Sequence, residues 1–415
     1  MLRHLKWLRS VGAIASLVAA SALASGCTSN HDGSAAKSGA CQAQNATSGG
    51  VVSADLQAVI SAAAPNDVIE VAGHCTGTFV VENDLVVRRA VDADHAVLDG
   101  GGAGTVLTIT GSEPDTRVQL SHLSVTGGSA DVGGGIRIVL AHVRLDGSRV
   151  VGNNAVQGGG IYSFGTLILS DTRVSGNRAS RLGGGVVTNG QLRLTASDAS
   201  SISKNRAPKG AGVYVLRDGV VLRGRSEIAR NSGGGIFSSA GRRTTCDVAM
   251  YGSSSVWGNR PGEGGSEGGG IAGCNRVVMN DRAQVHHNRG LAGGIRASKV
   301  VMNDRARVTD NVALSSGGGI YGGDWRIQRG VEMNDRALVA RNTADTGGGV
   351  YANYSHVVLR DRAAIVHNTA RVGGGVYSSA ICTTHHYRVA AHAGSTISHN
   401  VPRDIVIRWE PGGCS

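Results

Sequence analysis

Short alternating runs of apolar and polar residues, broken by turn residues, fill most of this chain. Residues 277–288 read VVMNDRAQVHHN. Val277 and Met279 are two positions apart, an Asn-Asp-Arg break follows, and the same spacing resumes with Ala283 and Val285. A period of two indicates β-strands, and the polar break indicates a tight turn. Helical spacing of three and four is absent from these segments, so they predict short strands joined by turns.

The same segment returns along the chain. VVMNDRARVTDN starts at Val300, 23 residues after the first copy, and related segments start at Val331 and Val357. From about residue 130, a glycine step ending in Ile or Val alternates with a Val/Ile-x-x-Asn marker, each in ten copies separated by 23 to 35 residues. The marker asparagines are Asn153, Asn177, Asn205, Asn231, Asn259, Asn288, Asn311, Asn342, Asn368 and Asn400. Three short strands per period predict one coil of a parallel β-solenoid, whose coils bury their apolar side chains by stacking.

The two markers have structural roles in such a solenoid. An asparagine at a bend can stack on its equivalent in the next coil, each amide donating to the next side-chain carbonyl, which satisfies polar groups that are costly to bury. Glycines suit tight corners, where positive φ excludes a Cβ. We therefore expect the repetition to specify the scaffold before any chemistry.

The alternating Gly-Gly-x-Ile and x-x-x-Asn markers resemble the repeats of chlamydial polymorphic outer membrane proteins, with Val or Ile in place of their Phe. More broadly, residues 50–415 resemble right-handed parallel β-helix proteins of the pectate-lyase-like superfamily. The resemblance implies an all-β, right-handed parallel β-helix. It implies little about function, because that superfamily includes lyases, hydrolases, esterases and adhesins.

The ends of the chain carry different signals. Residues 1–26 combine a basic start with a short apolar run, the layout of a secretory signal, and small residues before Cys27 resemble a bacterial lipobox. The resemblance implies a lipid on Cys27 and an exported protein tethered to the cell membrane or outer membrane, at the surface or in the periplasm; plain secretory cleavage is the alternative. Residues 27–49 read as a flexible tether. Leu56, Val59, Ile60 and Ala63 have helical spacing and predict a short capping helix before the first coil.

Cysteine usage supports export. Of seven cysteines, Cys27 would carry the lipid and six remain, an even number that suggests disulfides in an oxidising compartment. Six cysteines allow fifteen pairings. In chain order the expected pairs are Cys41–Cys75, Cys246–Cys274 and Cys382–Cys414, each separated by about one repeat.

Charge narrows the class of partner. The chain has 41 basic and 30 acidic residues; three basic residues lie in the signal, which leaves +8 after its removal. A moderate positive excess favours acidic partners such as polyanionic glycans or envelope phosphates. The excess is spread along the sequence, so we expect no nucleic-acid partner.

The turn that repeats in the copied segment places carboxylates that are candidates for metal binding or catalysis. Each aspartate in the column precedes an arginine: Asp281, Asp304, Asp335 and Asp361. Stacked carboxylates could bind Ca²⁺, with the arginines acting on an acidic sugar as in β-helix lyases. The alternative is structural: each aspartate caps its turn and pairs with an arginine of the neighbouring coil.

Aromatic and histidine residues offer two further candidates. An aromatic residue follows six of the ten glycine steps and gives a broken column, which strand alternation points outward: Tyr162, Tyr214, Phe237, Tyr321, Tyr351 and Tyr377. These rings could stack on sugars or a protein partner, or simply on one another. The doublets His286-His287 and His385-His386 should face opposite sides of their strands and form no chelate, so we expect no metal site.

Together these patterns predict a cell-envelope lipoprotein whose β-helix is a non-enzymatic, adhesin-like surface for a glycan or a protein, without a cofactor. The alternative is a polysaccharide lyase or glycoside hydrolase acting on acidic glycan, dependent on Ca²⁺ if a lyase. A spacer without a specific ligand is a third reading. The conspicuous carboxylates repeat with the scaffold, which argues against unique catalytic positions.

Overall fold

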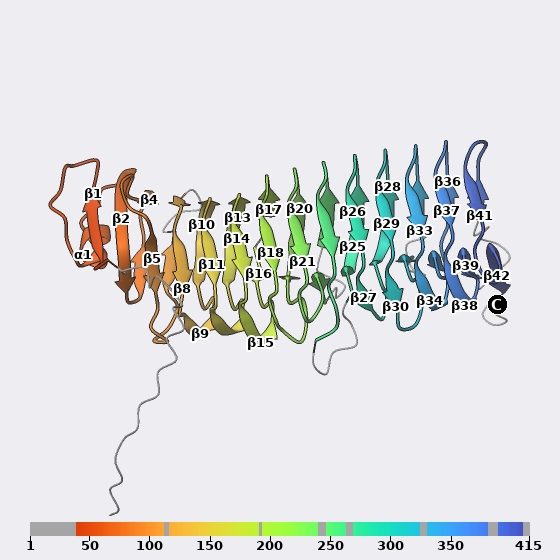
Figure 1. The fold of residues 1–415 in the computed structure, drawn as a ribbon, viewed down its shortest axis with the longest axis horizontal. Coiled ribbons are helices and arrows are strands. Elements are labelled where there is room, and N and C mark those ends of the chain that lie inside the picture. Colours follow the sequence, from red (N-terminus) through yellow and green to blue (C-terminus); the bar gives the residue numbers. More distant parts are fainter. Residues whose placement is uncertain are drawn as a thin grey trace, which may run out of the picture. The chain divides into compact units, whose positions relative to one another are not determined.

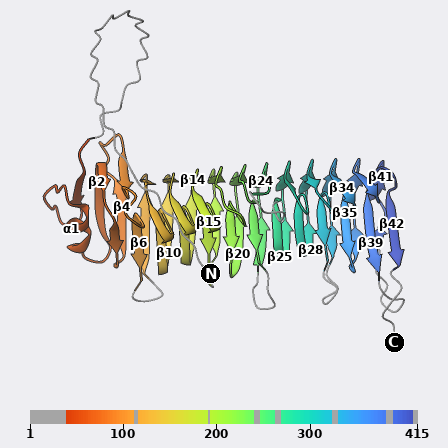
Figure 2. The ribbon, with the colours of Figure 1, turned by 90° about the horizontal axis from the view of Figure 1, so that it is seen from below.

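The computed structural model describes residues 39–111, 116–190, 193–239, 246–262, 269–323, 330–380 and 389–409. These residues form an all-β parallel solenoid of about 12 turns, which confirms the predicted fold class. Figures 1 and 2 show the coils stacked side by side. Each coil contributes to a long face, then to a short face, and then to a connecting side that leads back to the next coil.

The long face contains the strands that follow the glycine steps and those that precede the Asn-Asp-Arg turns. These strands are β2 Asp67–Thr76, β3 Phe79–Val81, β4 Leu85–Arg89, β6 Leu107–Thr110, β7 Arg117–Ser121, β10 Ile136–Asp146, β13 Ile161–Ser170, β16 Val186–Thr188, β17 Leu194–Ser197, β19 Val213–Val215, β20 Asp218–Leu222, β22 Ile236–Ser238, β23 Cys246–Met250, β25 Ile271–Met279, β28 Ile295–Met302, β31 Ile320–Gly322, β32 Val331–Met333, β35 Val350–Asn353, β36 Val357–Leu359, β39 Val376–Ala380, β40 Val389–Ala391 and β42 Ile405–Trp409.

The short face follows the Asn-Asp-Arg turns. Its strands are β5 Ala96–Asp99, β8 Ser124–Thr126, β11 Arg149–Val151, β14 Arg173–Ser175, β18 Ser201–Ser203, β21 Glu227–Ala229, β24 Ser255–Trp257, β26 Gln284–His286, β29 Arg307–Thr309, β33 Leu338–Ala340, β37 Ala364–Val366 and β41 Thr396–Ser398. The connecting side holds β9 Ser129–Val132, β12 Asn154–Gln157, β15 Arg178–Leu182, β27 Arg289–Gly290, β30 Val312–Ala313, β34 Thr343–Thr346 and β38 Thr369–Val372.

Equivalent residues of successive coils pair in register and build the core. Val277 pairs with Val300, which pairs with Val331, and Met279 pairs with Met302 in a parallel row. All five side chains are fully buried. Burying an aliphatic side chain of this size contributes about 1.5–3 kcal/mol. The alternation seen in the sequence therefore becomes an apolar interior with polar positions on the outer surface.

The N-terminal end carries the predicted helix. Helix α1 spans Leu56–Ser61, and the Asp55 side chain caps it by accepting the backbone N–H of Ala58. Leu56 and Ile60 are buried at this end of the solenoid (Figure 1). The stretch expected to be a tether belongs to the fold where it is described: β1, Gln42–Asn45, pairs antiparallel with β2. Backbone pairing and a disulfide at Cys41 hold this part against the first coil.

Two of the expected disulfides are present, Cys41–Cys75 and Cys246–Cys274. The second links β23 to β25 in the next coil, as the one-repeat separation predicts. Cys382 and Cys414 lie outside the described residues, as does Cys27. Among the described residues there is no helix of the length and apolarity needed to cross a bilayer.

Candidate functional site

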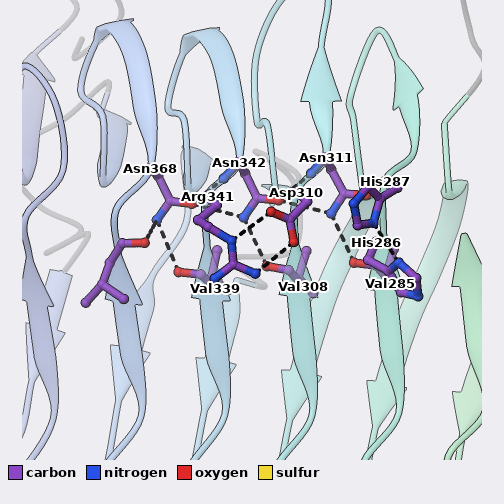
Figure 3. A network of polar contacts seen from close by, with 11 residues as sticks. Val285, His286, His287, Val308, Asp310, Asn311, Val339, Arg341, Asn342 and Asn368 are labelled. Carbon is purple, nitrogen blue, oxygen red and sulfur yellow. Dashed lines mark hydrogen bonds and ion pairs between the residues drawn. The ribbon is translucent and has the colours of Figure 1, made fainter. Parts of the chain in front are cut away.

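The marker asparagines form a buried ladder along the corner between the short face and the connecting side. From Asn153 to Asn368, each donates its backbone N–H and its Nδ2 to Oδ1 of the next asparagine at 2.9–3.1 Å. Nδ2 also donates to a backbone carbonyl of the preceding coil, as Asn311 does to Val285 (Figure 3). The ladder ends at Asp404, whose Oδ1 accepts both donors of Asn400. These groups are satisfied and buried, so the ladder is scaffold.

The glycine step and the ladder are two parts of one device. A Cβ on Gly319, the last glycine of its step, would lie 2.9 Å from Nδ2 of Asn342 and 2.7 Å from the Gly349 carbonyl oxygen. The last glycines of the other steps from Gly135 to Gly375 have the same relation to the ladder amide of their own coil. Real Cβ atoms essentially never approach so closely, so each ladder asparagine requires a glycine where its coil begins.

The carboxylates of the aspartate column also accept hydrogen bonds from the backbone. Asp281, Asp304, Asp335 and Asp361 have φ of 56–57°. Oδ2 of Asp304, Asp335 and Asp361 accepts the backbone N–H of the preceding aspartate in the column at 2.9–3.2 Å, and Oδ2 of Asp281 accepts that of Gly252 at 2.8 Å. Each carboxylate therefore caps the turn of the preceding coil.

The arginine half of that interpretation is wrong. Within the described part of the chain, the ion pairs do not include any of these four aspartates. Nor does that part contain a group of three or more His, Cys, Asp and Glu side chains arranged to hold a metal ion. Backbone hydrogen bonds, not arginine partners, account for the repeated aspartate.

The aromatic column points outward from the long face but is largely covered. Tyr214, Phe237 and Tyr377 are buried. Tyr321, Tyr351 and Tyr377 stack in sequence, with ring centroids 4.9 and 5.3 Å apart. Leu182 and Leu216 pack against the Tyr214–Phe237 part of the column, and Tyr162 lies at its margin. The faces needed for sugar stacking are taken by neighbouring rings, so the expectation of an exposed aromatic ligand surface is not supported.

A charged and aromatic row lies instead on the exposed side of the asparagine corner. Trp257 ends β24; its Nε1 donates to Glu227 Oε2 at 2.9 Å, and the Arg230 guanidinium lies 4.4 Å from the ring centroid. The other ring face stacks on His286 at 5.9 Å with an interplanar angle of 5°. The tryptophan therefore fixes Arg230 by a cation–π contact, worth about 0.5–1 kcal/mol when exposed.

The row continues through the histidine doublet (Figure 3). Strand β26 ends at His286, and His287 takes a left-handed turn with φ of 54°, so the two rings meet edge to face instead of facing opposite sides. Their Nδ1 atoms are 2.9 Å apart, so one nitrogen donates and the other accepts. Burial, and then the neighbouring charge of His287, lowers the pKa of His286.

An ion pair extends the row into the next coils. Arg341 donates to both carboxylate oxygens of Asp310, at 2.8 and 2.9 Å. Burial alone would raise the pKa of Asp310, but hydrogen bonds from Arg341 and Thr309 and the charges of Arg341 and His287 hold it below its ordinary value. This part of the row is internally neutralised.

Six exposed cations gather on the same corner further toward the N-terminus, and we call them the cationic ridge. They are Arg178, Lys204, Arg206, Arg230, Arg260 and Arg289, each directly before or after a ladder asparagine. Arg178 pairs with Arg206 in the next coil, so like charges are separated by about 4.8 Å of backbone spacing. In the described part of the chain, Arg178, Lys204, Arg260 and Arg289 form no ion pair.

The ridge is costly for the scaffold. Like charges directly opposite each other on neighbouring strands destabilise a sheet. Lys204 and Arg230 have φ of 56° and 55°, in a left-handed turn position that Gly176 and Gly258 fill in other coils. Left-handed backbone is unfavourable for residues with a Cβ. The sequence did not reveal this cluster, because its cations lie in five different repeats and come together only when the coils stack.

No protein-family model, curated protein or solved structure matches this chain. The resemblance to the pectate-lyase-like superfamily accordingly stays a prediction, whereas the parallel β-solenoid is observed.

Proposed function

We propose that this protein is a non-enzymatic binding scaffold of the cell envelope that holds an acidic glycan along its cationic ridge. The observation that carries the proposal is the alignment of exposed cations in successive coils. Arg178, Lys204, Arg260 and Arg289 form no ion pair in the described chain, so their like charges repel one another. A polyanion relieves this repulsion because it supplies a matching row of negative charges.

In this proposal the glycan is not held mainly by stacking on aromatic rings, because the rings already have neighbours. Trp257 is sandwiched between Arg230 and His286, and the tyrosine column stacks on itself. Charge complementarity is thus the dominant attraction, and binding should weaken steeply with ionic strength because exposed charges are screened within about 10 Å at 0.1 M salt.

Export and anchoring are part of the proposal. The basic start and apolar run of residues 1–26 and the small residues before Cys27 support secretion with lipid attachment at that cysteine. Two disulfides in the fold are consistent with an oxidising compartment. Mass spectrometry of the N-terminal peptide from the membrane fraction tests the anchor: an acylated Cys27 is expected, and an unmodified N-terminus at another residue would refute it.

The binding function is tested with the mature chain carrying Cys27→Ser, which leaves the protein in solution. Retention on immobilised acidic and neutral polysaccharides is measured alongside new reducing ends and unsaturated-product absorbance, with and without Ca²⁺. We expect salt-sensitive retention on acidic glycans without turnover. Cleavage of any glycan would refute the non-enzymatic function and support the lyase or hydrolase alternative. Equal retention on neutral glycans, or preferential retention on nucleic acid or anionic vesicles, would refute an acidic glycan as the partner.

A further inference from the structure

A cleft of about 420 Å³ lies on the outer surface of the long face, toward the N-terminal end of the solenoid. Strands β4, β7, β10 and β13 of four successive coils form it, and their register places Val86 beside Gln119, Gln119 beside Arg144, and Arg144 beside Ile168. Small-molecule sites in proteins typically enclose about 300–1,000 Å³, so this cleft has the size for a small ligand.

Two polar side chains of the cleft, Arg117 and His142, have no hydrogen-bond or ion-pair partner in the described part of the chain. Arg117 lies beside His142 in the next coil. Among the described residues, no hydrogen bond or ion pair involves the Arg117 guanidinium or the His142 imidazole. Gln119 donates through Nε2 to Ser121 at 3.0 Å, which leaves Oε1 as an acceptor. Arg144 lies 3.7 Å from Asp146 and also interacts electrostatically with Asp198.

The cleft lining includes the cations Arg117 and Arg144 and the carboxylate of Asp84. Asp146 lies 3.7 Å from Arg144, so Arg117 is the guanidinium that is available to an anion. The Asp84 carboxylate accepts the backbone N–H of Arg117 at 2.8 Å, so it is held at the rim by the main chain. Val86 and Ile168 add an apolar surface beside these groups.

We propose that this cleft binds a small monocarboxylate with an apolar body. The Arg117 guanidinium matches the two oxygens of a carboxylate with paired N–H donors, which is the geometry that arginine recognises best. His142 supplies a further donor, Gln119 Oε1 accepts a hydroxyl or amide N–H, and Val86 and Ile168 contact the apolar body. A peptide C-terminus presents an apolar side chain beside its carboxylate, and a sugar acid presents the apolar C–H face of its ring. The site is separate from the cationic ridge and does not depend on it.

Calorimetric titration of the mature Cys27→Ser chain tests the site with glucuronate, N-acetylalanine, glucose and inorganic phosphate. We expect one carboxylate to bind at one site per chain, and its identity distinguishes the sugar from the peptide source. Arg117→Ala should weaken binding about tenfold or more, because a hydrogen-bonded charge is lost, and Gln119→Ala should weaken it less. Arg276→Ala, an exposed arginine on the same face but outside the cleft, is the matched control and should bind as the parent does.

Three results would overturn the proposal: no carboxylate binding by the parent, unchanged affinity in Arg117→Ala, or equal binding of glucose or phosphate. Each variant's thermal unfolding is recorded, and Arg117→Lys, which keeps the charge but not the paired donors, should recover only part of the affinity. Substitutions of ridge residues such as Arg260 and Arg289 leave the cleft residues untouched, so loss of glycan binding at the ridge and loss of carboxylate binding in the cleft are distinguishable.

Discussion

Removing one asparagine from the middle of the ladder should destabilise the solenoid far more than its small volume suggests. Asn311 is fully buried, and it makes four side-chain hydrogen bonds. In Asn311→Ala, the backbone N–H of Asn288 loses its acceptor, while the Val285 carbonyl loses this donor. Nδ2 of Asn288 keeps its bond to Val256, and Oδ1 of Asn342 keeps the backbone N–H of residue 311.

The magnitude follows from these partners. A buried donor left unsatisfied costs about 1–3 kcal/mol, and each further lost hydrogen bond costs about 0.5–1.5 kcal/mol net. With one orphaned N–H and three other partners that each lose one hydrogen bond, Asn311→Ala should lower the free energy of unfolding by about 2.5–7.5 kcal/mol. A water molecule entering the space would move the value toward the lower end, since it can reach several polar partners.

Asn303→Ala is the matched control. Asn303 belongs to a second, partly exposed row, in which it donates to Asn280 and accepts from Asn334 at 2.8 Å. Solvent can replace both bonds, so the loss should be about 1 kcal/mol or less. Guanidinium unfolding measures both variants, and hydrogen exchange shows whether the coils around β26, β29 and β33 open locally, because a solenoid need not unfold in one step. Equal losses in the two variants would refute the assigned role of the ladder.

Three other predictions follow from the same contacts. Gly319→Ala should lower the free energy of unfolding by about 1–3 kcal/mol through overpacking, since its Cβ would meet Asn342 Nδ2 at 2.9 Å. Thermal unfolding checks this against Gly50→Ala, whose Cβ would meet its nearest atoms at 3.7 Å, an ordinary contact, and comparable losses would contradict it. Asp404→Ala removes the acceptor that ends the ladder, so hydrogen exchange should accelerate in β41 and β42 while β24 keeps the parent rate; uniform change along the chain would contradict it. Burial and then the charge of His287 lower the pKa of His286 below 6.5, so the unfolded state binds more protons as the pH falls through 6.5 toward the folded-state pKa, and stability falls in that window. The free energy of unfolding should depend less on pH across this range in His286→Gln, but not in the exposed control His392→Gln. An unchanged dependence on pH in His286→Gln would exclude this residue as the cause.

The fold was predictable because its signals repeat. Ten spaced asparagines and glycine steps specify both the coil and the ladder, and the helical spacing at Leu56 and Ile60 specifies α1. The coupling between Gly319 and Asn342 was not predictable, because nothing in the spacing says that the two residues close the same coil.

Features that occur only once in the chain were harder to predict from the sequence. Asp404 continues the ladder without matching its marker, so no pattern pointed to it. Alternation placed Tyr214 outward, but it could not show that Leu182 from the connecting side would pack against this column. The row from Glu227 through Trp257 to His286 joins three coils, and its members share no motif.

The proposed glycan binding depends most directly on the cationic ridge, and a comparison of two double variants tests it. Arg260→Ser with Arg289→Ser removes two ridge charges from neighbouring coils, whereas Arg305→Ser with Arg336→Ser removes two exposed arginines of neighbouring coils from the Asn-Asp-Arg turns. Both change the net charge equally. Affinity for an immobilised acidic glycan at low salt should fall about tenfold or more in the ridge variant and stay near the parent value in the turn variant. Equal losses would show that net charge alone drives retention, and no loss in the ridge variant would contradict the proposed binding surface.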